Sequence, residues 1–158
     1  MCKEGFLFVS YCMKKTVCIF VAFIAVLTVA AQNEIAWNVC HDKKKLFSSS
    51  IENEEQNNLV VNLSDLRPGK DFIITYQGVY TPEQKGQWKR TIGIYTAADK
   101  ELYRTDSAVL KISDLQLKKF LQGNKTIKVY TWALPKDPKE AARVRVRRVH
   151  LCTIMLKQ

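Results

Sequence analysis

The stretch Asp71–Tyr80, DFIITYQGVY, decides the fold class of this sequence. β-branched and aromatic residues dominate it, and a turn signal, Pro68-Gly69, precedes it. Side chains alternate between two faces along a strand, so one face gathers the large apolar groups. That face carries Phe72, Ile74, Tyr76 and Tyr80. The stretch is therefore predicted to be a strand packed on a core.

Further runs of the same composition lie on both sides of this strand, with turn signals between them. The expected strands are 34–40, 59–63, 88–96, 101–104, 108–112, 126–134 and 143–156. Helices do not alternate with these strands, which disfavours a parallel α/β sheet. The sequence predicts an all-β protein, an antiparallel β-sandwich of seven to eight strands, either immunoglobulin-like or jelly-roll.

One segment breaks the β pattern. Ser113-Asp114-Leu115-Gln116 has the form of a capping box, and Gly123 is the expected stop signal. Between them, apolar residues recur at helical spacing. The sequence predicts one short connecting helix here.

The first 31 residues have the layout of a signal peptide. The uncharged run 16–31, TVCIFVAFIAVLTVAA, follows Lys14 and Lys15 and ends in small residues suited to cleavage. It is shorter than the roughly 20 apolar residues of a stable membrane span, although an uncleaved anchor is the alternative. Met13 is a more natural start than Met1. We expect a signal peptide at 1–31, a single domain at 32–158 without a stable membrane span, and export to the periplasm, the cell surface or the medium.

The charge of the chain is strongly positive. The whole chain carries +10, and residues 32–158 carry +8, with 22 Lys and Arg against 14 Asp and Glu. Such a surface favours acidic partners. For an exported protein we expect a glycan or another acidic envelope component, or a protein partner, and no nucleic acid.

Two cysteines, Cys40 and Cys152, remain after the expected cleavage. In an oxidising compartment such a pair most simply forms one disulfide, which would join the first strand to the last. Together with His41 and His150 these cysteines offer two alternatives, a zinc site or a Cys-His nucleophile. The usual zinc spacings are absent, so no metal and no cofactor are expected.

Arginines alternate with valines in the expected last strand. Arg143, Arg145 and Arg147 would share one face and form a ladder suited to carboxylate, sulfate or phosphate groups. The adjacent pair Arg147-Arg148 disturbs the alternation, which suggests a β-bulge. The alternative interpretation is a solvated outer face whose arginine stems cover apolar neighbours.

Aromatic residues gather on the expected strand 126–134. Tyr130 and Trp132 fall on one face beside Lys128, an arrangement suited to stacking on a sugar ring and bonding its hydroxyls. Trp88 and Tyr95 are further aromatic candidates, on opposite faces of their own strand. The alternative is that these rings only fill the core or its rim.

No catalytic motif of the common hydrolase, metalloprotease or nucleotide-binding classes is present. The leading hypothesis is an exported, non-enzymatic β-sandwich that binds a glycan or another surface component. The alternatives are a structural accessory subunit that docks on another envelope protein, and an uncharacterised hydrolase or metal-binding protein.

Overall fold

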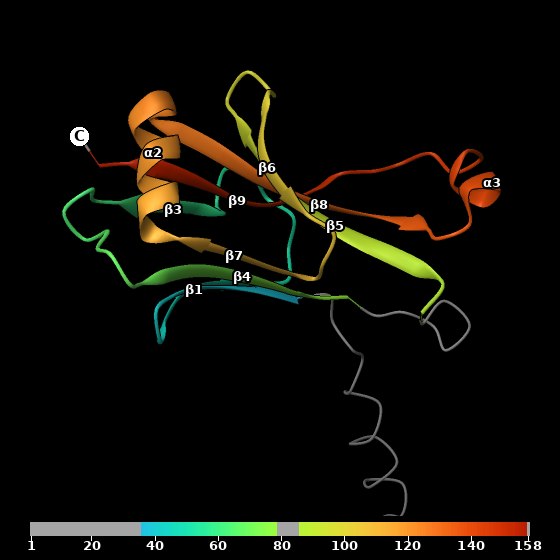
Figure 1. Ribbon diagram of the computed structural model, residues 1–158, viewed down its shortest axis with the longest axis horizontal. Helices are drawn as coiled ribbons and strands as arrows, with labels where there is room; N and C mark the ends of the chain where they lie inside the picture. The colour runs from blue at the N-terminus through green and yellow to red at the C-terminus, as the bar shows by residue number, and fades with distance from the viewer. Residues whose placement is uncertain (1–35, 79–85, 158) are drawn as a thin grey trace, which may run out of the picture. The chain divides into compact units, whose positions relative to one another are not determined.

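Two β-sheets form the body of the computed structural model, which describes residues 36–78 and 86–157. Their orders are β2-β1-β4-β7 and β3-β9-β8-β5-β6, and Figure 1 shows the two layers. The strands are β1 (Ala36–His41), β2 (Lys44–Ser49), β3 (Asn58–Val61), β4 (Asp71–Gln77), β5 (Trp88–Thr96), β6 (Glu101–Thr105), β7 (Val109–Ser113), β8 (Thr126–Pro135) and β9 (Val149–Leu156). The expected signal peptide, Met13 and Tyr80 lie outside the described residues.

The predicted all-β sandwich is confirmed, with three refinements. The β3–β9 pair is parallel, whereas every other strand pair is antiparallel. Strand β2 was not among the expected strands, and it forms a hairpin with β1 through Asp42, whose φ of 55° suits a tight turn. The last strand begins at Val149 rather than at Arg143.

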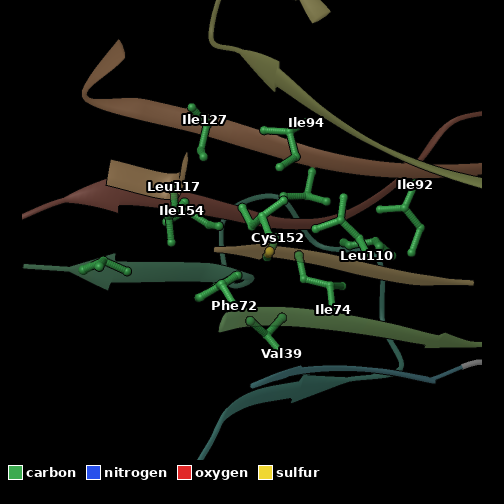
Figure 2. Close-up of a cluster of buried hydrophobic side chains, with 14 of the residues drawn as sticks. Val39, Phe72, Ile74, Ile92, Ile94, Leu110, Leu117, Ile127, Cys152 and Ile154 are labelled. Carbon is green, nitrogen blue, oxygen red and sulfur yellow. The ribbon is translucent and has the colours of Figure 1, made fainter. Parts of the chain in front are cut away.

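The core fills the space between the two sheets. The apolar face predicted for β4 is buried, with Phe72, Ile74 and Tyr76 all less than a tenth exposed. Figure 2 shows Cys152 of β9 inside the cluster that these side chains share with the five-stranded sheet. Trp37 of β1 crosses between the layers, and its indole N–H donates to the Leu151 carbonyl oxygen at 2.7 Å.

Helix α2 (Asp114–Asn124) stands at the end of the sandwich that holds the C-terminus (Figure 1). Its N-cap is the predicted one, because the Ser113 hydroxyl accepts the Gln116 N–H at 3.3 Å. Gly123 does not end the helix. The helix continues to Asn124 and ends at Lys125, which takes a φ of 35°. A second, short helix, α3 (Pro138–Ala141), replaces the turn expected between the last two strands.

A buried carboxylate fixes the start of α2 against β1. Asp114 is fully buried, and its two oxygens lie 2.8 and 3.0 Å from His41 Nε2. The Arg67 backbone N–H donates to the same carboxylate at 2.9 Å. A buried charge is tolerated only with such partners, so this cluster sets where α2 packs.

Candidate functional site

The outer face of the five-stranded sheet carries the aromatic residues of β8. Ile127, Val129 and Thr131 are buried, so the alternate residues point away from the core. These are the three that the sequence grouped together, Lys128, Tyr130 and Trp132, and each is partly exposed. The structure therefore places them on one surface.

Neighbouring strands add two rings to this surface. Tyr95 of β5 lies 5.8 Å from Tyr130 and 6.3 Å from Trp132, measured between ring centroids. His150 of β9 meets Tyr130 edge-on at 5.5 Å. We call Tyr95, Tyr130, Trp132 and His150 the aromatic cluster. Tyr95 was a weaker candidate in the sequence, because only the pairing of β5 with β8 reveals its neighbours.

A glycine lets the aromatic cluster close. Gly93 of β5 is paired with Tyr130 of β8 and lies under the rings. A Cβ atom at this position would stand 2.8 Å from the Tyr95 ring and 3.1 Å from Trp132. Any side chain larger than hydrogen would push these rings outward, so the close packing of Tyr95 and Trp132 depends on Gly93.

Trp88, the other aromatic candidate of β5, takes no part in the aromatic cluster. It pairs with Pro135 at the far end of the β5–β8 ladder. Because side chains alternate along β5, Trp88 lies on the same face of the strand as the core-facing residues Ile92 and Ile94.

Arg148 covers part of the aromatic cluster. Its guanidinium carbon lies 5.1 Å from the Tyr95 ring centroid and 5.0 Å from that of Tyr130, within cation–π range. Its Nη2 also pairs with Asp99 Oδ2 at 2.7 Å. The hydrogen bond from Arg148 lowers the pKa of Asp99. Arg148 is thus a surface cation fixed in place by two rings and a carboxylate.

Carboxylates of the loop between β2 and β3 complete the surface. Glu54 Oε2 pairs with Lys128 Nζ at 3.0 Å, and Glu54 Oε1 lies 3.5 Å from the Tyr130 hydroxyl, which donates to it. The hydrogen bond from Lys128 lowers the pKa of Glu54. Glu52 accepts the His150 backbone N–H at 3.1 Å and pairs with the Arg147 guanidinium. No local sequence pattern marks these glutamates, because their partners lie 74 or more residues further along the chain.

His150 is a packing group under this surface. Its side chain is almost fully buried, with Nε2 2.9 Å from the Thr153 hydroxyl and Nδ1 without a hydrogen-bond partner. Burial lowers the pKa of His150, so its ring is neutral near neutral pH. It supports the Tyr130 ring rather than offering a charge to a ligand.

The predicted arginine ladder was wrong. Arg143, Arg145 and Arg147 lie in the irregular segment before β9, and all three are exposed. The reason is a bulge at Leu151, since Val129 pairs with Cys152 and Tyr130 with His150. With that register Arg148 points outward, and continuing the strand would turn Arg147 and Arg145 toward the core side.

The predicted disulfide is absent, and both cysteines are free thiols. Trp37 and Val39 point into the core. Because side chains alternate between the two faces of β1, Cys40 lies on the outer side of the four-stranded sheet. Cys152 is fully buried between the sheets. Burial raises the pKa of its thiol to about 12.

The Cys and His residues do not gather into one site. The bulge at Leu151 sends His150 to the outer face and Cys152 to the core, so the two side chains do not share a face of β9. His41 is engaged by Asp114 at the start of α2. In the described ranges no three His, Cys, Asp or Glu side chains are placed to hold a metal ion.

Fold and surface together define a small all-β sandwich with an ion-paired aromatic surface on its five-stranded sheet. Comparison with family models, curated proteins and solved structures gives no match to this chain. Neither helix in the described part of the chain is long and apolar enough to cross a bilayer.

Proposed function

We propose that this chain is an exported, non-enzymatic protein of the cell envelope or cell exterior that binds a glycan on the outer face of its five-stranded sheet. The observation that carries the proposal is the aromatic cluster, set on a regular sheet and flanked by fixed charges. Residues 14–31 support export through their signal-peptide pattern.

The surface supplies both kinds of contact that a sugar requires. Trp132 and Tyr130 are partly exposed rings, which present apolar area to the C–H face of a pyranose. Glu54, Asp99 and Lys128 stand beside them and are suited to accept from or donate to hydroxyl groups. Because the rings pack on one another, little conformational entropy is lost when a ligand binds.

The carboxylates of this surface are better suited to binding than to catalysis. A general acid needs a raised pKa, whereas hydrogen bonds from Lys128 and Arg148 lower the pKa values of Glu54 and Asp99. Both carboxylates are therefore ionised at neutral pH, as acceptors for hydroxyl groups.

A second candidate function is that of an accessory subunit docking through a strand edge. Strand β8 pairs with β5 as far as Pro135, but its pairing with β9 ends at Thr131. Residues 132–135 thus leave one edge of β8 without a β9 partner, and such edges accept a strand from another chain. A docked protein partner with no glycan binding would favour this alternative.

Trp132→Ala is expected to weaken glycan binding about 30-fold, since truncating a central aromatic contact costs about 2 kcal/mol. The measurement is retention on immobilised neutral and acidic polysaccharides, with circular dichroism to verify folding. Val109→Ala, at an exposed position of β7 on the other sheet, is the control and should bind as the wild type does. Equal retention of Trp132→Ala and wild type, or no retention of the wild type on any polysaccharide, would contradict the proposal.

A further inference from the structure

The segment between β8 and β9 concentrates the positive charge of the molecule. We call residues 136–148 the basic arm; it contains α3 and leads into β9. It has six Lys and Arg against two carboxylates, a net +4, which is half of the +8 carried by residues 32–158. Charge of this density in one exposed segment attracts polyanions.

Two arginines of the basic arm stand apart from the other cations near the site. Lys128, Arg147 and Arg148 are each paired with a carboxylate, so the aromatic surface itself is nearly neutral. Arg143 and Arg145 are exposed, and no carboxylate of the described residues lies within salt-bridge distance of either. Their guanidinium groups are available to an external anion.

The basic arm is continuous with the aromatic cluster. It starts one residue after the end of β8, which carries Trp132, and it ends at Arg148, which stacks on Tyr95 and Tyr130. Arg143 lies five residues before Arg148, at most about 17 Å along an extended chain. A polysaccharide of several sugar units that lies across Trp132 would be long enough to reach both Arg143 and Arg145.

We propose that the glycan bound at the aromatic cluster is acidic, a uronate-bearing polysaccharide whose carboxylates are held by Arg143 and Arg145. Guanidinium groups pair with carboxylates through two parallel hydrogen bonds, which gives geometric selectivity as well as charge attraction. The inference rests on the proposed function, because Trp132 is taken to hold the sugar rings while the basic arm selects for their charge.

The test compares binding of alginate, a polyuronate, with binding of dextran, a neutral polysaccharide. The double variant Arg143→Gln/Arg145→Gln is expected to lose at least tenfold in alginate affinity, and 0.3 M NaCl should weaken the wild type similarly. Lys118→Gln/Lys119→Gln on α2 removes the same charge elsewhere and should change alginate affinity less than twofold.

Three results would overturn this inference. The wild type could fail to bind alginate, or the arginine variant could bind alginate as tightly as the wild type does. The third result is an equal loss of alginate affinity in the arginine and lysine variants. Arginine-dependent binding to phosphatidylglycerol vesicles without alginate binding would instead assign the basic arm to a membrane surface. Trp132→Ala separates the two proposals. If this variant loses polysaccharide binding while the arginine variant binds as the wild type does, the glycan site is supported and only the role of the basic arm is rejected.

Discussion

Asp114→Ala is expected to lower the free energy of unfolding by about 2–5 kcal/mol, because two hydrogen-bond donors would each lose their acceptor at a cost of about 1–3 kcal/mol. The carboxylate is fully buried and holds both His41 and the Arg67 backbone N–H. Alanine would leave these two groups without their partner and would remove the acidic residue from the first turn of α2.

Urea denaturation followed by circular dichroism measures this loss. The matched control is Asp71→Ala, which breaks the exposed pair with Lys111 at the surface of the four-stranded sheet. Exposed pairs contribute about 0–1 kcal/mol, so the control should remain close to wild type. If Asp114→Ala cost no more than Asp71→Ala, the cluster at the start of α2 would not be a determinant of the fold.

Cys152 is expected to react with iodoacetamide at least a thousandfold more slowly in the folded chain than in the unfolded one. The thiolate is the reactive species, and burial raises the pKa of this thiol from 9.0 to about 12. At pH 8 that shift alone lowers the thiolate fraction about a thousandfold. Exclusion of the reagent from the core slows the reaction further.

Alkylation with and without denaturant, read by peptide mass spectrometry, measures these rates. Denaturation without a reductant should release both Cys40 and Cys152 for complete labelling, because each of them is a free thiol. If Cys152 became reactive only after reduction, the result would support the disulfide predicted from the sequence. Rapid labelling of the folded chain would contradict the burial of Cys152 and reopen thiol chemistry.

Much of the fold was predictable, because most strands carry their signal locally. The expected strand 88–96 coincides with β5, and the alternation of Asp71–Gln77 places its large apolar residues in the core. Strand β2, KKLFSS, was missed because an edge strand has one neighbour and keeps charged residues. Its identity depends on pairing with β1, which no local pattern reveals.

The site was predictable only in part. Alternation along β8 placed Lys128, Tyr130 and Trp132 on one face correctly. Arg148 was missed because the extra residue of β9 is Leu151, and the sequence HLC gives no sign of where pairing with β8 shifts. The contact of Arg148 with Asp99, 49 residues away, arises only once both flank the same sheet.

The most direct test of the glycan site follows the indole N–H signals of the ¹⁵N-labelled chain during titration with the polysaccharide that the wild type retains best. Trp132 lies in the proposed site, whereas Trp37 donates its N–H to Leu151 inside the core and serves as an internal reference. The expected result is a saturable shift of the Trp132 signal with the Trp37 signal unchanged. A Trp132 signal that stays unshifted at saturating ligand would contradict binding on this face.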